Sequence, residues 1–432
     1  MLIRFAVENF RSIRQRVEID FRVAKRFSSS RLPDNFTALP DSEESVVKVM
    51  ATFGANASGK SNLLHAIDAL SAYVRDSTTY RGELKIPEYQ PFRLSAEQEK
   101  RPTRFEIDFI ATDGLRYVYQ LSYTDRVVVE ENLFVYSGAD KRRKNLLFER
   151  NSTGDLRTGP LYTGPAGFNL YDNQLILSQV AVSPNPSLQP AYTFFAHSLF
   201  CYTFHDTVMD DNLLIKLREE WDAEIDQTNF VENINKILRA ADTSIERIEI
   251  RGDLEKSVRN LYNGRKILVL QEKRIKTIHK IVDENGSITG FAEFDLVDES
   301  TGTQKLLLVA GIVLRAFERG QTLVFDELDK SLHPHLSRML IGLFNDPEIN
   351  KNNAQLLLTT HDATILDREL FRPDQILFAN QEYDGGSTYR KLSDFSGVSK
   401  VTNLDEWYLL GQFGGVPMIN EFELDLDIER AA

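Results

Sequence analysis

The sequence predicts an α/β fold, with a core of alternating strands and helices that is split by a long insertion carrying an antiparallel β subdomain and a short helical segment. Apolar residues 46–53 have the length of a buried strand and run through a glycine loop into a helical pattern. Residues 104–136 alternate apolar and polar side chains between turn signals, as antiparallel strands do. Helix and strand patterns resume after residue 300. We therefore expect two core halves and one insertion, at residues 1–80, 296–432 and 81–295.

The predicted elements follow in order along the chain. The first half of the core has short strands and a helix whose apolar residues recur every three or four positions; they are strands 2–10, 17–21 and 46–53 and a helix after residue 61. The insertion combines alternating strands, a loop-rich stretch and helical segments: strands 104–110, 115–123 and 127–136, loops 150–190, helical residues 210–241, and strands 245–250 and 273–282. The second half has helices 304–319 and 335–344 and strands 322–325, 356–360 and 375–378.

Composition narrows the class of protein. The 432 residues include 51 Lys and Arg against 64 Asp and Glu, so the net charge is −13. A protein that coats nucleic acid through its overall charge needs a basic face, so the negative net charge argues against this class of protein. A local basic groove that binds nucleic acid remains an alternative. The longest apolar run, residues 306–314, is far shorter than the about 20 residues of a membrane span. The single cysteine, Cys201, cannot form an internal disulfide, so we expect a cytoplasmic protein without a membrane anchor.

A phosphate-binding loop is the most specific motif. Residues 54–61 match G-x-x-x-x-G-K-[ST] between a predicted strand and a predicted helix. The glycines let backbone N–H groups point at phosphate oxygens, and the helix N-terminus adds partial positive charge. The lysine of this motif reaches the β- and γ-phosphates, and its last hydroxyl ligates Mg²⁺. Without an Asn-Lys-x-Asp guanine motif, ATP is favoured over GTP. The predicted nucleotide ligands are Gly54, Asn56, Ser58, Gly59, Lys60, Ser61 and Asn62.

Two adjacent carboxylates end a later apolar strand. Residues 322–325 are followed by Asp326 and Glu327. In P-loop proteins the first such carboxylate holds the metal, so Asp326 joins Ser61 as a predicted Mg²⁺ ligand. Glu327 is placed to take a proton from the attacking water. An apolar run ending in Asp-Glu is a weak signal alone, because it often marks a strand leaving the core, and the upstream P-loop makes it strong.

A second anion-binding segment and a histidine complete the predicted site. Ser300, Thr301, Gly302 and Thr303 stand at the start of an apolar helix, where free N–H groups favour an anion. Ser300 is equally a helix N-cap, and the two roles are compatible. His361 follows the buried strand 356–360. A histidine in such a place is often a satisfied core residue or a cap, but its position after the Asp-Glu strand favours a catalytic role.

The order of these motifs resembles that of ABC-type ATPases, most closely the soluble branch that includes SMC, RecF, SbcC-type and overcoming-lysogenisation-defect ATPases. Within it the chain resembles the ATPases of bacterial anti-phage systems of the PARIS type. The similarity covers about residues 1–75 and 295–420 and rests on the following segments: Asn9-Phe10-Arg11-Ser12, the Glu-Ser-x-Gly-Thr signature, residues 326–334, and residues 408–417. The overcoming-lysogenisation-defect ATPases carry an appended Toprim nuclease, and we expect this chain to differ from them in lacking that domain after residue 417.

The resemblance implies a role for each matched position. Lys60, Glu327 and His361 become the catalytic residues, with His361 as the switch histidine that senses the γ-phosphate. Ser300, Gly302 and Thr303 contact the nucleotide held by a second copy, and Asp329 lies in a loop that crosses the dimer interface. Arg11 flanks the nucleotide base. Gln90 is a candidate for the Q-loop glutamine, and an ordinary loop residue is an equal alternative.

The resemblance also implies partners. The chain is expected to form a head-to-tail ATP-sandwich dimer or a higher homo-oligomer, and to act as the sensor or scaffold of an anti-phage complex. It would control a separately encoded effector, a Toprim or HNH nuclease. The alternatives are a DNA repair or maintenance ATPase that clamps nucleic acid directly, and a module that binds ATP without turnover. The basic run at residues 141–144 is either a solvated turn or a contact for nucleic acid or an acidic protein.

Overall fold

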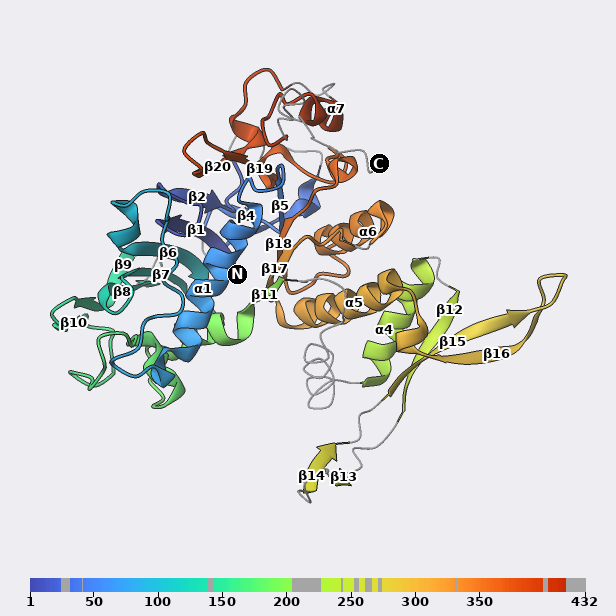
Figure 1. Cartoon of the computed structure of the whole chain (residues 1–432), viewed down its shortest axis with the longest axis horizontal. Coiled ribbons are helices and arrows are strands. Elements are labelled where there is room, and N and C mark those ends of the chain that lie inside the picture. Colours follow the sequence, from blue (N-terminus) through green and yellow to red (C-terminus); the bar gives the residue numbers. More distant parts are fainter. Residues whose placement is uncertain are drawn as a thin grey trace, which may run out of the picture.

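A computed structural model describes most of the chain (Figure 1). The described residues are 1–24, 32–40, 42–137, 143–203, 227–241, 244–251, 256–260, 266–270, 274–330, 332–398 and 403–416. Residues 141 and 142 of the basic run, the predicted helical residues 210–226 and Pro417 lie outside these ranges.

A six-stranded sheet forms the centre of the molecule. Its strand order is β11-β17-β18-β5-β19-β20, and only β20 is antiparallel to its neighbour. The strands are β11 (Leu199–Thr203), β17 (Thr322–Asp326), β18 (Gln355–Thr359), β5 (Val49–Phe53), β19 (Ile376–Gln381) and β20 (Ser387–Lys391). Because β5, β17 and β18 are parallel, the segments that follow them leave the same edge of the sheet. This edge brings together the glycine loop, Asp326 and His361.

Helices cover both faces of the central sheet. Helix α1 (Lys60–Asp76) shares a core with Met50, Val324 and Leu357 on one face. Helices α5 (Thr301–Arg319) and α6 (Pro334–Asn345) share a second core with Ala51 and Phe325 on the opposite face. The two cores follow from the alternation of side chains along each strand. The predicted fold class, an α/β P-loop NTPase core with an insertion, is confirmed.

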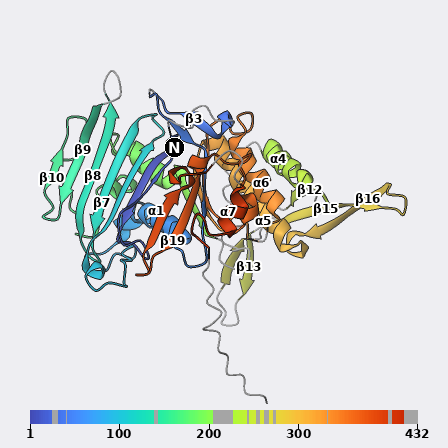
Figure 2. The same cartoon turned by 90° about the horizontal axis from the view of Figure 1, so that it is seen from above.

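A seven-stranded antiparallel sheet lies against the other side of α1 (Figure 2). Its order is β10-β9-β8-β7-β6-β1-β2. The strands are β1 (Leu2–Glu8), β2 (Val17–Asp20), β6 (Thr103–Ile110), β7 (Arg116–Tyr123), β8 (Val128–Ser137), β9 (Arg143–Asn151) and β10 (Leu156–Thr158). Helix α1 is therefore packed between two sheets.

A third group of elements, beside the central and the antiparallel sheets, projects from the side of α5 (Figure 1). It contains helix α4 (Gln227–Ala240) and the antiparallel strands β12 (Ile245–Arg251), β15 (Arg274–Val282) and β16 (Ile288–Asp295). We call these four elements the arm. The separate hairpin of β13 (Lys256–Asn260) and β14 (Lys266–Leu270) lies between β12 and β15 in sequence. Helix α4 and β12 share the core of α5, so the base of the arm is packed on that helix.

Short elements connect these layers. Two of them are short strands, β3 (Phe36–Ala38) and β4 (Ser45–Val47). The short helices are α2 (Gln189–Thr193), the π-helix η6 (Phe194–Ser198) and α7 (Leu404–Leu409). The 3-10 turns are η2 (Pro33–Asn35), η3 (Ser77–Thr79), η4 (Gln98–Lys100), η5 (Leu177–Ala181), η7 (Leu296–Asp298), η8 (Ala363–Ile365), η9 (Pro373–Gln375) and η10 (Leu392–Asp394). None of the helices that the structure describes is long and apolar enough to cross a bilayer.

The sheets cross the boundaries that the sequence predicts for the insertion. β6, within residues 81–295, pairs with β1 at Phe105–Val7 and Ile107–Phe5. β11, also within that range, pairs in parallel with β17 of the core. The antiparallel sheet is thus shared between the N-terminal strands and the middle of the chain, and one core strand comes from the middle. Strand partners are set by packing between distant segments, which a local pattern does not encode.

Candidate nucleotide-binding and catalytic site

The glycine loop has the backbone that phosphate binding requires. Strand β5 ends at Phe53, and α1 begins at Lys60 after Gly59 with φ +99°. A Cβ on Gly54 would lie 2.6 Å from Ser58 Oγ and 2.7 Å from the carbonyl oxygen of Ala379, so a larger residue does not fit. Asn56 is exposed, whereas Ser58 and Gly59 are buried. The loop is therefore a tight turn at a helix N-terminus, as the sequence predicts.

Lys60 is folded back into its own loop. Its Nζ donates to the carbonyl oxygens of Gly54 at 2.7 Å and Ala55 at 3.0 Å. The residue is 5 % exposed, and burial lowers the pKa of the ammonium group to about 8, against the opposing effect of Glu327 and Asp326. A desolvated ammonium group in a glycine loop gains most from a nearby anion.

Ser61 and Asp326 form a pair of oxygen donors. Ser61 Oγ donates to Asp326 Oδ1 at 3.0 Å, and Thr359 Oγ1 donates to the same oxygen at 2.6 Å. Thr359 Oγ1 also accepts from the backbone N–H of Glu327 at 2.8 Å. Thr359 thus fixes both acidic residues at the end of β17. A hydroxyl and a carboxylate are the hard oxygen ligands that Mg²⁺ takes in phosphate sites, so these residues fit that ion.

His361 connects Lys60 to Glu327. Its Nδ1 lies 3.3 Å from Lys60 Nζ and its Nε2 lies 3.3 Å from Glu327 Oε1. An ammonium group only donates, so Nδ1 is the acceptor. The ring then carries its proton on Nε2 and donates it to the carboxylate, an assignment made from these partners. The three predicted catalytic residues therefore form one continuous hydrogen-bonded row.

Two buried polar atoms near this row have no partner among the described residues: Ser58 Oγ of the glycine loop and Asp329 Oδ1. Asp329 Oδ2 accepts from the backbone N–H of His361 at 3.3 Å. Unpaired buried polar atoms are costly unless a ligand, water or ion completes them. Together with the desolvated Lys60, the orphan hydroxyl of Ser58 fits a loop that takes a triphosphate.

Arg11 lies at the first turn of α1. Its Nε donates to Gln90 Oε1 at 2.6 Å, and its Nη1 lies 3.5 Å from Asn62 Oδ1. Asn62 Nδ2 donates to Ser12 Oγ at 2.7 Å. The structure thus gathers Arg11, Asn62 and the Q-loop candidate Gln90 beside the glycine loop, although Arg11 and Gln90 are far apart in sequence.

The predicted signature residues lie at the start of α5. Ser300 is the N-cap: its Oγ accepts from the backbone N–H of Thr303 at 3.1 Å. Thr301 is exposed, and Gly302 is half-buried. Helix α5 lies on the sheet face opposite α1, and no hydrogen bond described for these residues joins them to Lys60. Within one copy, the structure does not bring the signature together with the glycine loop.

The residue before the signature is tied to the arm. Glu299 Oε1 accepts from Thr277 Oγ1 at 2.5 Å and lies 2.7 Å from His279 Nε2, both on β15. These side chains are largely buried. The alternating pattern of residues 273–282 predicts a surface position for His279, but the structure buries its side chain against Glu299, which lies twenty positions further along the chain.

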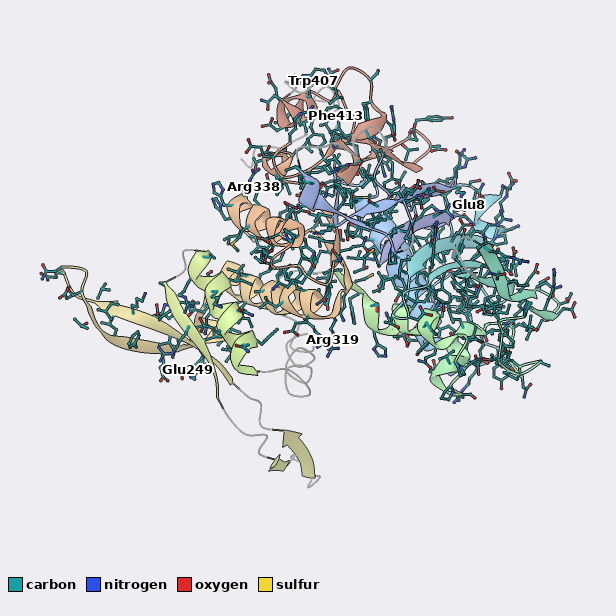
Figure 3. All side chains as sticks on the ribbon, turned by 180° about the vertical axis from the view of Figure 1, so that it is seen from behind. Glu8, Glu249, Arg319, Arg338, Trp407 and Phe413 are labelled. Carbon is teal, nitrogen blue, oxygen red and sulfur yellow. The ribbon has the colours of Figure 1, made fainter. Side chains whose placement is uncertain are left out.

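A C-terminal glycine turn covers the start of the glycine loop. Tyr408 Oη donates to the carbonyl oxygen of Gly415 at 3.0 Å, and Trp407 lies beside Phe413 with ring centroids 6.0 Å apart (Figure 3). A Cβ on Gly415 would lie 3.1 Å from Gly54 Cα. The motif at residues 408–416 therefore packs on the glycine loop.

This contact gives a testable prediction. Gly415 and Gly397 both have left-handed backbones, at φ +68° and +80°, but a Cβ on Gly397 would meet no described atom within 4 Å. Each Gly→Ala change should cost about 1 kcal/mol of folding free energy from backbone strain. Only Gly415→Ala should also weaken ATP binding, by about fivefold (~1 kcal/mol). Calorimetric titration of the two variants measures this difference, and equal affinities would refute the contact's role.

The sheet order and the placement of loop, carboxylates and histidine at one edge define a P-loop NTPase. The chain belongs to the family described as "AAA domain, putative AbiEii toxin, Type IV TA system", which matches residues 49–367.

Solved structures similar to this chain include SMC heads and RecF. The SMC head domain from Thermotoga maritima is 13% identical, with a TM-score of 0.39 over 90% of this chain and 98% of that one. The Pyrococcus furiosus Smc head bound to the C-terminal domain of ScpA is 13% identical, with a TM-score of 0.46 over 91% and 96%. The recombination mediator RecF with ATP is 13% identical, with a TM-score of 0.39 over 90% and 99%. A search of curated protein sequences found no match.

Proposed function

We propose that this chain is an ATPase that binds ATP and Mg²⁺ between two copies of itself and uses binding and hydrolysis as a conformational switch. The observation that carries the proposal is the row Lys60–His361–Glu327, which joins a phosphate-binding loop to a carboxylate through one histidine. A phosphate ligand and a general base are the two groups that phosphoryl transfer to water needs.

Each residue of the site has a separate role in the proposed hydrolysis of ATP. Lys60 leaves the carbonyl oxygens of its own loop and neutralises the β- and γ-phosphates. Glu327 Oε1 or Oε2 takes a proton from the water that attacks the γ-phosphorus, and ADP leaves with inorganic phosphate. The side chain of Glu327 is 34% exposed, so water can reach it. His361 Nε2–H holds this carboxylate in place. Ser61 and Asp326 would hold Mg²⁺, which supplies charge neutralisation on the phosphate oxygens.

The second copy completes the site. In one copy, α5 lies on the sheet face opposite α1, and no hydrogen bond described for the signature at Ser300–Thr303 joins it to the glycine loop. A head-to-tail pair with two-fold symmetry brings each signature to the other copy's γ-phosphate. The free N–H groups at the start of α5 suit that anion. Asp329 would lie near this interface, and Arg11 and Asn62 beside the base.

The switch would act on a further protein. The family description names a toxin and a toxin–antitoxin system, which supports a role in a system of more than one component. We propose that the chain is the sensor or scaffold of an anti-phage complex and controls a separate effector nuclease. Nucleotide-dependent changes at the dimer interface are the signal that such an effector would sense.

Two measurements test the ATPase proposal. Purified protein should release phosphate from ATP in the presence of Mg²⁺. Sedimentation should show a species of about twice the 49.4 kDa chain with ATP and a smaller share of it with ADP. A protein that releases no phosphate and sediments identically with and without ATP would refute the proposal.

A further inference from the structure

The backbone of Glu327 is held in an unusual conformation. Its φ is +51°, in the left-handed region that glycine prefers and a glutamate rarely adopts. Such residues persist where the surrounding structure fixes them, and they gather at functional sites. Glu327 directly follows β17, whose five residues are all buried, so its position depends on what holds the turn after the strand.

The turn is fixed at both ends of Glu327. Its backbone N–H donates to Thr359 Oγ1 at 2.8 Å, and its carbonyl oxygen accepts from Lys330 N at 3.0 Å. The same carbonyl oxygen accepts from Lys305 Nζ at 3.2 Å, and Lys305 also donates to the carbonyl oxygen of Lys330. One side chain from α5 therefore bridges the first and last residues of the turn 327–330.

Lys305 is an unusual residue for its place in α5. It is 8% exposed, and the next residues of the helix, Leu306, Leu307 and Leu308, belong to the apolar core. Burial lowers the pKa of Lys305 to about 8, while Asp329 opposes this shift. A buried amine is costly, and the hydrogen bonds to the carbonyl oxygens of Glu327 and Lys330 offset part of that cost. Lys305 stands one helical turn after the signature, on the same helix.

We propose that Lys305 is a positioning residue for hydrolysis: it holds the left-handed turn that aims Glu327 and links the signature helix α5 to that turn. When the start of α5 engages the nucleotide of a second copy, Lys305 passes the resulting shift of the helix to the catalytic carboxylate of its own copy. This inference rests on the ATPase activity proposed above.

Three variants test it. Lys305→Met keeps the length of the side chain and removes the donor, Lys305→Arg keeps a cationic donor, and Arg319→Ala removes a cation from the far end of α5 (Figure 3). We expect Lys305→Met to lower kcat about tenfold to a hundredfold, because a small misplacement of a catalytic group has that effect. Its KM should stay within about twofold, since Lys305 contacts the turn and not the glycine loop. Lys305→Arg should recover most of the loss, and Arg319→Ala should match the wild type.

A second readout does not depend on turnover. Hydrogen exchange of residues 326–330 should become faster in Lys305→Met, because the amide of Lys330 is bonded within the bridged turn. Wild-type kcat in Lys305→Met, unchanged exchange, or an arginine variant as impaired as the methionine variant would overturn the inference. A wild-type protein without ATPase activity would refute the proposed function instead, and exchange would still report whether Lys305 holds the turn.

Discussion

We expect Glu327→Gln to abolish ATP hydrolysis while ATP-dependent association of two copies is preserved. Glutamine has the shape of glutamate and can still accept the hydrogen bond from His361 Nε2 through its amide oxygen. It cannot take a proton from water. General-base catalysis contributes about a hundredfold to ten-thousandfold, so turnover should fall by about three orders of magnitude.

Steady-state phosphate release and sedimentation with ATP measure the two halves of this prediction. Glu348→Gln, which removes an exposed carboxylate beyond α6, is the matched control and should behave as the wild type. If Glu327→Gln kept turnover within twofold of the wild type, Glu327 would not be the base. If Glu327→Gln lost ATP-dependent association together with turnover, the change would have damaged the dimer interface or the glycine loop.

Lys60→Ala should lose most of its affinity for ATP. The ammonium group lies inside the glycine loop, and a hydrogen bond to a charged group is worth about 1.5–3 kcal/mol. The expected loss of affinity is therefore roughly tenfold to a hundredfold or more, since each 1.4 kcal/mol is a factor of about ten. Titration with a fluorescent ATP analogue measures it, with Lys351→Ala at an exposed position as the control.

The loss should not come from unfolding. The pKa of Lys60 is lowered from 10.5 to about 8 by burial, so the folded, nucleotide-free protein disfavours the proton that the unfolded chain binds. This penalty is full below pH about 8 and disappears as the pH rises towards 10.5. At neutral pH, Lys60→Ala should therefore melt at or above the temperature of the wild type. Unchanged ATP affinity in a folded variant would contradict the assignment of the glycine loop.

The motifs of the site could be predicted because their chemistry is local in sequence. The glycine loop, Asp326 with Glu327, and His361 each follow an apolar strand, and parallel strands bring such segments to one edge of a sheet. The N-cap role of Ser300 also follows from its place before an apolar helix, and the structure has that hydrogen bond.

Other features depend on contacts between distant segments. The sequence predicts the strand β1 but does not reveal that β6 is its partner, and the apolar residues of β11 do not place it beside β17. The bond from Lys305 to Glu327 joins residues whose proximity depends on how α5 packs on the sheet. The left-handed backbone of Glu327 has no sequence signal, because that conformation normally selects glycine or asparagine.

The pairing of two copies around one nucleotide is tested most directly with a mixed dimer. Lys60→Ala and Ser300→Arg would be co-expressed with different affinity tags, and the heterodimer isolated through both tags. If the signature acts on the partner's nucleotide, one site of the heterodimer carries both changes and the other carries neither.

Phosphate release by this heterodimer is the measurement. Each variant alone should be inactive, and the heterodimer should recover about half of the wild-type rate, because one of its two sites is intact. A heterodimer no more active than the two variants measured separately would contradict the shared site.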